Sequence, residues 1–358
     1  MRFDAERQRV LLNDVLRSTL ALALAFAVAG VALLALGYSP AMALAALLRG
    51  SVGSGAAWTA TLLKAGPLLL TGLAVALSFR CGVWNIGAEG QLYVGALCAT
   101  AVATHWLPEA NAYVLLPALV VAGAAGGAAW AAIAGALRAW RDVSEVISTI
   151  LLNFVAIQLV SLAVHGPLQE AAARYPQSEL FSQAARLPAF ARIHLGVPLA
   201  VGLAFAAALL LFRTSLGFRL RAVGLSPLAS RFAGIRPGPH MLIALAIAGA
   251  LAGLAGAFEV AGVTGRLFER LSPGYGFTAI AVALLARLHP VAVIPSALLF
   301  GALEVGGGAM QREAGVPSVA TELVKGVVIL VSVGFAMAGS TRLPADRIEP
   351  VAATAETR

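Results

Sequence analysis

Three polar side chains stand close together in an otherwise apolar stretch, Gly82–Ala96. Asn85, Glu89 and Gln91 are separated there by glycines. A carboxylate in hydrocarbon costs about 2.5 kcal/mol or more, so such groups are expected to face the interior of a helix bundle or water. Irregular backbone at this depth is tolerated only where protein surrounds it or where it lines a cavity. The stretch is therefore a candidate for a solute pathway or its gate.

The same stretch is expected to contain the start of a helix. Asn85 is a residue type that caps helix N-termini, which would place Glu89 near the positive end of a helix over Ala88–His105. Helix ends beside cavities are where transporters hold solutes. A structural interpretation stays open beside this one, in which the polar groups hydrogen-bond neighbouring helices and hold them together.

A second polar group of residues follows in the stretch that begins at Asp142. Glu145, Thr149 and Asn153 are four residues apart, so on a helix they share one face. A polar stripe on a membrane helix is expected to face the interior, which adds Asn153 to the pathway candidates. Glu145 lies near the expected cytoplasmic end, where it would be solvated or pair with Arg141.

A third candidate region is the basic segment Arg213–His240. Ser226 can cap a short helix, Pro227 suits its first position and Gly234 can end it. Phe232 belongs to one apolar edge of that helix. A basic amphipathic helix beside a membrane can bind a protein partner or lie on anionic membrane lipid.

The composition indicates the elements that must position these residues. With 60% hydrophobic and 12% charged residues, the chain is not a soluble globular protein. Apolar runs near 20 residues recur, which predicts an all-α, polytopic helical membrane protein. We expect one transmembrane domain over residues 1–358 with about ten membrane segments, or eight plus a re-entrant pair.

The re-entrant alternative arises from the segment near residue 280. As a helix, Phe277–Arg287 would span about 17 Å, well short of the roughly 30 Å hydrocarbon core. Prolines follow at once, so a chain break is expected there, with Gly306–Gly308 at the outer end of the next helix. Phe277 and Thr278 lie beside this break and join the pathway candidates.

Charge distribution predicts the orientation of the chain. The net charge is +8, but the basic residues are scattered among helix ends and not gathered on one face, which argues against nucleic acid as a partner. Lys and Arg concentrate on alternate connecting segments, as the positive-inside rule requires. Both termini are then cytoplasmic, with residues 1–19 as a lead, 213–240 as a cytoplasmic loop and 339–358 as a tail.

Motifs for catalysis and metal binding were sought along the chain. The sequence contains no GxxxxGK[ST] phosphate loop, no HExxH and no GxSxG, and its five histidines are far apart. We therefore expect no catalytic residues, no metal site and no cofactor bound by this chain.

Four stretches resemble one protein family. They are NIGAEGQ, EVISTILLNF, the basic segment SLGFRLRAVGLSPLASRFAGIRPG, and SPGYGFTAIAVALLARLHP. Together they resemble permease subunits of bacterial ABC importers, in the superfamily for nucleosides, simple sugars and branched-chain amino acids. The resemblance covers about residues 55–335 and is closest to the nucleoside branch, which works with a substrate-binding lipoprotein.

This resemblance implies a function and a set of partners. The chain would translocate nucleosides or related purine and pyrimidine compounds across the inner membrane, beside a second homologous permease subunit. A separate cytoplasmic ATPase would bind ATP and Mg²⁺, and an extracytoplasmic binding lipoprotein would deliver solute. The resemblance implies that the ATPase docks on a coupling helix through these residues: Arg221, Gly224, Pro227, Arg231, Phe232 and Gly234.

Other functions stay open on the sequence alone. A sibling permease would carry a simple sugar or a branched-chain amino acid. An ion-coupled secondary transporter would use Glu89 or Glu304 as its proton or sodium site, and would transport without an ATPase. An intramembrane enzyme would require turnover by the purified chain alone.

Overall fold

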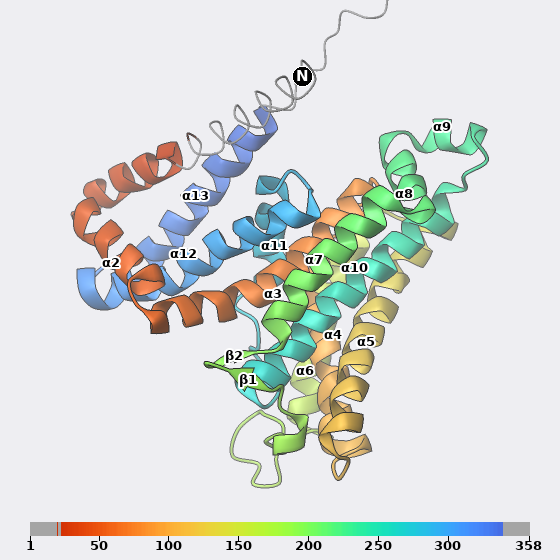
Figure 1. Cartoon of the computed structure of the whole chain (residues 1–358), viewed down its shortest axis with the longest axis horizontal. Coiled ribbons are helices and arrows are strands. Elements are labelled where there is room, and N and C mark those ends of the chain that lie inside the picture. Colours follow the sequence, from red (N-terminus) through yellow and green to blue (C-terminus); the bar gives the residue numbers. More distant parts are fainter. Residues whose placement is uncertain (1–19, 21–22, 339–358) are drawn as a thin grey trace, which may run out of the picture.

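The computed structural model describes residue 20 and residues 23–338, which form a predominantly helical protein (Figure 1). The predicted cytoplasmic lead and tail, residues 1–19 and 339–358, lie outside the described residues. Six helical segments in the described part are long and apolar enough to cross a membrane. They confirm a helical, multi-pass membrane protein, while the count of ten segments and the cytoplasmic termini stay predictions. The six are α3 (Gly55–Arg80), α5 (Ala112–Arg141), α6 (Glu145–Val164), α7 (Gly196–Arg213), α10 (Pro237–Glu259) with the π-helical turn η3 (Val260–Thr264), and α12 (Val293–Ala314) with the 3-10 turn η4 (Pro290–Ala292) before it.

Glycines set the closest packing in the larger bundle, where α5 and α10 lie side by side (Figure 1). A Cβ atom added to Gly127 would lie 2.2 Å from the carbonyl oxygen of Gly249, and one added to Gly253 would lie 2.2 Å from that of Gly123. Gly123 and Gly127 on α5, and Gly249 and Gly253 on α10, have the GxxxG spacing that predicts close helix packing. These two faces pack against each other, because small residues let helix backbones approach closely. Helix α4 (Ala88–Ala101), followed by the π-helical turn η1 (Val102–Trp106), packs against both helices.

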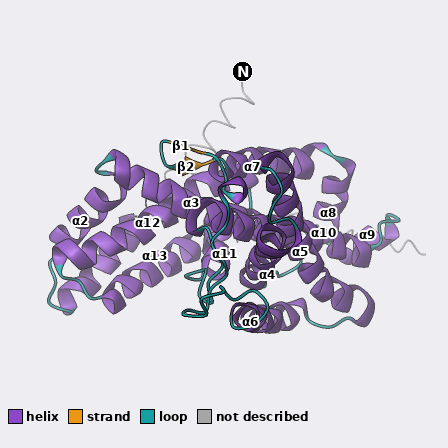
Figure 2. Ribbon diagram, turned by 90° about the horizontal axis from the view of Figure 1, so that it is seen from below, coloured by secondary structure: helices purple, strands orange, loops and turns teal. Residues whose placement is uncertain are grey.

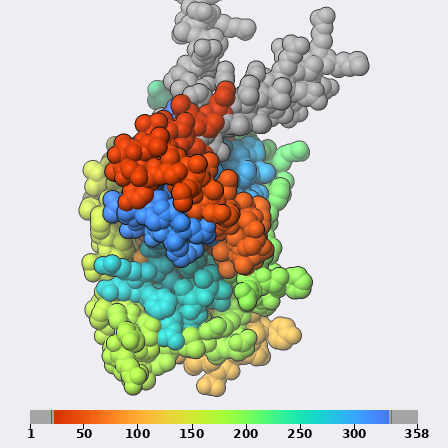
Figure 3. Space-filling view, turned by 90° about the vertical axis from the view of Figure 1, so that its left-hand side faces the viewer, coloured from red at the N-terminus to blue at the C-terminus, as the bar shows by residue number. Residues whose placement is uncertain are grey.

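A smaller group of helices lies to one side of α3. It contains Ala23–Ala35, α2 (Pro40–Val52), α12 and α13 (Ser318–Ala338). Figure 2 shows α2, α12 and α13 together at one edge, and Figure 3 shows N-terminal and C-terminal segments adjoining on this face. Their own hydrophobic cluster includes Leu33, Leu47 and Met310. The first and last parts of the described chain are thus packed together.

Helix α2 corrects an expectation from the sequence. In the sequence, Gly37, Ser39 and Pro40 predict the end of the first helix, followed by a loop that leads to a helix starting at Trp58. Instead, Ser39 caps the start of α2 by accepting from the N–H of Met42, and Pro40 occupies the first helical position. Ser and Pro are start signals as well as breakers, so the same residues end one helix and begin the next.

The segment between α6 and α7 is a long, folded connection. It contains the 3-10 turn η2 (Gln183–Ala185) and a hairpin of β1 (Ala189–Phe190) and β2 (Ile193–His194). The buried Ser178 ties it to the loop after η3, because its N–H donates to the carbonyl of Leu267 and its hydroxyl accepts from the N–H of Leu267, both at 2.9 Å. This connection and the α8–α9 region lie at opposite ends of the bundle (Figure 1).

The chain break predicted near residue 280 is present. Helix α11 (Tyr275–Leu285) is short, and Arg287 and Leu288 after it have φ angles of 50° and 58°. The predicted end of the next helix at Gly306–Gly308 is wrong, since α12 continues to Ala314. Gly306 lies inside α12 for packing reasons: a Cβ atom there would be 2.7 Å from the carbonyl oxygen of Leu47 on α2.

Candidate functional site

The polar stretch after α3 is an irregular segment that leads into α4. Gly82 has a φ of +73°, and helical structure resumes only at Ala88. The predicted N-cap at Asn85 is wrong, because Gly87 takes that position. The side-chain oxygen of Asn85 accepts instead from the N–H of Gly87, at 2.9 Å, inside the turn that precedes the helix.

Asn85 and Gln91 form a reciprocal amide pair. Nδ2 of Asn85 donates to Oε1 of Gln91 at 3.1 Å, and Nε2 of Gln91 donates to Oδ1 of Asn85 at 2.9 Å. Both side chains are buried. Each buried amide therefore has a partner, and the pair closes the irregular segment onto the first turn of α4.

Helix α6 supplies the next contacts. Asn153 accepts from the N–H of Gly90 and donates to the carbonyl of Ile86, both at 2.8 Å. Thr149 accepts from the N–H of Ile86 at 3.3 Å. The predicted polar stripe therefore faces the interior, and it satisfies backbone groups that the irregular segment leaves unpaired.

Glu89 joins the starts of two helices. Its Oε2 accepts from the N–H of Gly276, in the first turn of α11, at 2.6 Å, and its side chain is only 2% exposed. A Cβ atom on Gly276 would lie 2.1 Å from the backbone nitrogen of Glu89, so the two backbones are in direct contact. N–H groups in a first helical turn have no partner within their own helix, which explains the need for the carboxyl group. No sequence pattern indicated this contact.

The two remaining pathway candidates separate from each other. Phe277 is 46% exposed at the surface. Thr278 is half-buried and lines a cavity of about 170 Å³ with Tyr275, Glu304 and Lys325. The structure thus gathers Asn85, Glu89, Gln91 and Asn153 at one buried point and places Thr278 beside it. Their role in transport stays a prediction.

Glu145 pairs with a different arginine from the one expected. Its Oε2 lies 3.2 Å from Nε of Arg138, and its Oε1 accepts from the N–H of Trp84 at 3.4 Å. The expectation of Arg141 was wrong because α5 continues to Arg141 and the chain turns at Asp142, where φ is 53°. Arg138, about one turn back, is the residue that reaches the start of α6.

The predicted short helix in the basic segment is present as α9 (Pro227–Phe232). Ser226 caps it by accepting from the N–H of Ala229 at 3.2 Å, and Gly234 after it has a φ of +79°. An additional helix, α8 (Ser215–Leu225), precedes it. The side chain of Phe232 is 86% exposed and that of Arg231 is exposed, so α9 presents both to its surroundings.

Two other residues of this segment face the bundle instead. A Cβ atom on Gly224 would lie 2.1 Å from the carbonyl oxygen of Arg80, and one on Gly82 would lie 3.2 Å from Cα of Gly224. The guanidinium of Arg221 lies 5.3 Å from the centroid of the Phe212 ring, and that of Arg80 lies 5.8 Å from the same centroid. Helix α8 therefore packs directly against the start of the irregular segment.

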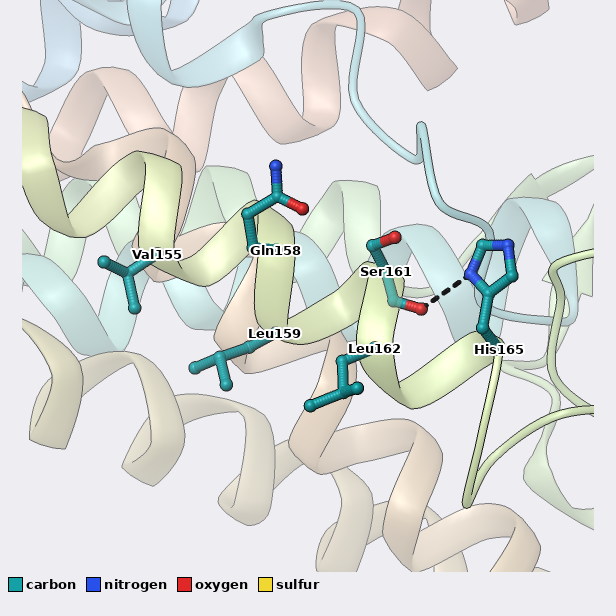
Figure 4. Close-up of a pocket in the computed structure, with 6 residues that line it drawn as sticks. All are labelled: Val155, Gln158, Leu159, Ser161, Leu162 and His165. Atoms are coloured by element: carbon teal, nitrogen blue, oxygen red, sulfur yellow. Dashed lines mark hydrogen bonds between the residues drawn. The ribbon is translucent and has the colours of Figure 1, made fainter.

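A surface hollow of about 510 Å³ lies along α6 (Figure 4). It is mainly apolar, and His165 at its end bonds the carbonyl of Ser161 at 2.9 Å. Gln158 lines it and is exposed, so this side chain lies apart from the buried polar stripe of Thr149 and Asn153. Within the described ranges, no three His, Cys, Asp or Glu side chains are grouped to hold a metal ion.

Together, the helical spans and the buried polar junction define a multi-pass helical membrane protein. Residues 57–333 match the family described as branched-chain amino acid transport system / permease component, and the chain belongs to this family. It is 41% identical to the glucose ABC transporter permease protein TsgB13 of Haloferax volcanii, over 86% of this chain and 83% of that protein. It is 35% identical to the guanosine ABC transporter permease protein NupP of Bacillus subtilis, over 89% and 93%. It is 31% identical to NupQ, a guanosine ABC transporter permease protein of the same organism, over 68% and 78%.

These relationships confirm the predicted class. The chain is a permease subunit of the ABC importer type, and therefore a transport component rather than a catalytic one.

Proposed function

We propose that this chain translocates a nucleoside, or a related purine or pyrimidine compound, across the bacterial inner membrane. The observation that carries the proposal is the likeness to the guanosine permease NupP over nearly the whole of both chains. A simple sugar is the second candidate, because a glucose permease protein is 41% identical. Both classes of solute contain a neutral ring that carries several hydroxyl groups.

The proposed transporter contains two different permease chains. NupP and NupQ, both guanosine permease proteins of Bacillus subtilis, are each similar to this chain, which supports a pair of homologous subunits. A cytoplasmic ATPase holds ATP and Mg²⁺, and an extracytoplasmic lipoprotein delivers the solute. This chain itself supplies the pathway and the contact with the ATPase.

Helix α9 is the proposed site of ATPase docking. Leu228 and Phe232 are 65% and 86% exposed on a helix that is well capped, so an apolar edge is available to a partner. Just before α9, Gly224 rests on Gly82 at the base of the irregular segment. A movement of α8 and α9 on ATPase binding would therefore be transmitted, through the contact between Gly224 and Gly82, to the irregular segment that contains Asn85.

The docking proposal is tested with Phe232→Asp. The exposed side chain makes little contribution to folding, so the variant should insert normally but retain little ATPase on purification. Phe190→Asp is the matched control, because Phe190 is 89% exposed at the opposite end of the bundle. Normal co-purification and normal solute-stimulated ATP hydrolysis in Phe232→Asp would place the docking site elsewhere.

A further inference from the structure

The cavity beside the buried junction differs from the junction in its chemistry. It lies among α3, α11, α12 and α13 and has a volume of about 170 Å³. Tyr275, Thr278, Glu304 and Lys325 provide its polar lining, and Leu68 and Phe300 are among its apolar lining. A few placed polar groups among apolar walls are typical of small-molecule sites.

The junction itself is closed to a solute in this structure. Asn85, Glu89 and Gln91 are at most 2% exposed. Their hydrogen bonds run to one another, to backbone, or, for Glu89, also to the side chain of Ser272. The cavity residues retain more capacity to bind. Lys325 contacts Oε2 of Glu304 at 2.9 Å, and a carboxylate has further acceptor positions on its other oxygen. Hydroxyl groups such as that of Thr278 both donate and accept.

Charge restricts the class of ligand. Glu304 and Glu322 line the cavity with one lysine, Lys325, so this group carries a net negative charge. The nearby Lys64 donates to the hydroxyl of Tyr275 at 2.9 Å and interacts electrostatically with Glu259. A phosphate or carboxylate would be repelled here, whereas neutral hydroxyl groups can donate to the carboxylate.

The junction positions the cavity. Glu89 accepts from the N–H of Gly276, and two nearby residues of α11 line the cavity: Tyr275, directly before Gly276, and Thr278, two positions after it. The polar motif after α3 therefore holds the first turn of α11, which carries two of the residues that line the cavity.

We propose that this cavity binds the neutral, hydroxyl-bearing ring of the transported solute and excludes anionic forms such as nucleoside phosphates. This proposal rests on the proposed function, and it adds where the solute binds and which chemical class of ligand the cavity accepts. The carboxylate of Glu304 accepts hydrogen bonds from hydroxyl groups of the ring, and the hydroxyl of Thr278 both donates to them and accepts from them. The apolar walls of the cavity cover the carbon face of the ring.

The test is equilibrium binding to the purified permease complex in nanodiscs, without the binding lipoprotein. The probes are guanosine, glucose and guanosine monophosphate. Thr278→Val removes the hydroxyl at nearly constant shape and should weaken binding of the neutral solute about 5- to 50-fold, whereas Thr278→Ser should restore it. Glu304→Gln should weaken binding of the neutral solute and raise the affinity for guanosine monophosphate relative to guanosine.

Glu313→Gln is the control, because Glu313 lies on the same helix but pairs with Arg49 outside the cavity. Unchanged affinity and selectivity in Thr278→Val and Glu304→Gln, with wild-type binding intact, would overturn the cavity assignment and leave the proposed function standing. A wild-type complex that bound only the anionic probe would overturn both.

Discussion

Glu89 has a structural contact that its residue type and its position in the sequence do not indicate. A buried carboxyl group suggested contact with solute, yet its oxygen accepts from the backbone of α11. Asn85, Gln91 and Asn153 likewise bond one another or nearby backbone. The motif therefore holds together three segments of the chain: the irregular segment with α4, α6 and the start of α11.

Substitutions of Glu89 test this role. Glu89→Gln retains an oxygen that accepts from Gly276, whereas Glu89→Ala leaves that buried N–H unpaired at a cost of about 1–3 kcal/mol. We expect the free energy of unfolding and the uptake rate to fall clearly for Ala and little for Gln. Thermal unfolding and uptake into proteoliposomes measure the two effects. A proton-coupled carrier would instead lose uptake equally in both variants and would respond to a pH gradient.

The residue types in the site were predictable from sequence, but their partners were not. The spacing of Glu145, Thr149 and Asn153 correctly indicated an inward face, because helical periodicity is local. The bond between Glu89 and Gly276 joins residues 187 positions apart, and nothing in either local sequence specifies it. Contacts between residues far apart in the sequence depend on how the helices pack, and a single sequence does not specify that packing.

At the scale of elements, small residues determine which helices lie together. The glycine faces of α5 and α10 are in backbone-to-backbone contact, so neither helix can accept a larger side chain at these positions. Local signals predicted much of this, including both GxxxG faces and the caps of α9. The same signals gave a wrong prediction at α2, because one Ser-Pro pair follows the end of one helix and starts the next. They also gave a wrong prediction in α12, whose glycines lie inside the helix and allow close packing.

Gly127→Val tests the α5–α10 contact. Its new side chain would meet the carbonyl oxygen of Gly249, a backbone atom that cannot move aside, and we expect a loss of about 1–3 kcal/mol or more in the free energy of unfolding. Gly202→Val on α7 is the control, because no atom lies within 4 Å of a Cβ atom there. Equal thermal stability of the two variants would contradict the packing argument.

The hairpin before α7 should respond to acid. His194 is buried, its Nε2 is without a hydrogen-bond partner, and burial lowers its pKa below the ordinary value. As pH falls below about 6.5, the unfolded chain takes up a proton that the folded hairpin resists, so stability decreases. At higher pH this effect is absent.

The measurement compares Tm at about pH 7.5 and about pH 5.5 for wild type and His194→Phe. We expect a smaller decrease in Tm for the variant, because Phe keeps an aromatic ring and cannot be protonated. The same decrease in both proteins would assign the acid response to other groups.

The described part of the molecule consists of a large bundle and a smaller helical group, and α12 contributes buried residues to the hydrophobic clusters of both. Composition predicted a multi-pass helical protein, since hydrophobic length is read directly from sequence. The pairing of Ala23–Ala35 and α2 with α12 and α13 was not predictable, because it joins the first and last described helices through a common apolar cluster. The predicted orientation is open to a direct test.

Single cysteines test that orientation in a background in which Cys81 and Cys98 are replaced. Ala172→Cys lies in the exposed α6–α7 connection, and Leu225→Cys lies at the end of α8, where the side chain is 88% exposed. We expect a membrane-impermeant maleimide to label intact cells only at position 172, and both positions after permeabilisation. Labelling of position 225 in intact cells would reverse the assignment of sides.

The contact of Gly224 with Gly82 and Arg80 has a consequence for protein engineering. A chimaera that borrows residues 213–240 from a relative, in order to accept a foreign ATPase, also borrows the surface that rests on residues 80–87. A side chain larger than hydrogen at position 224 would meet the carbonyl oxygen of Arg80 and push the transplanted helices away from the host. To make this permease accept a different ATPase, residues 80–87 and residues 213–240 must therefore be exchanged together, although more than a hundred positions of the chain lie between them.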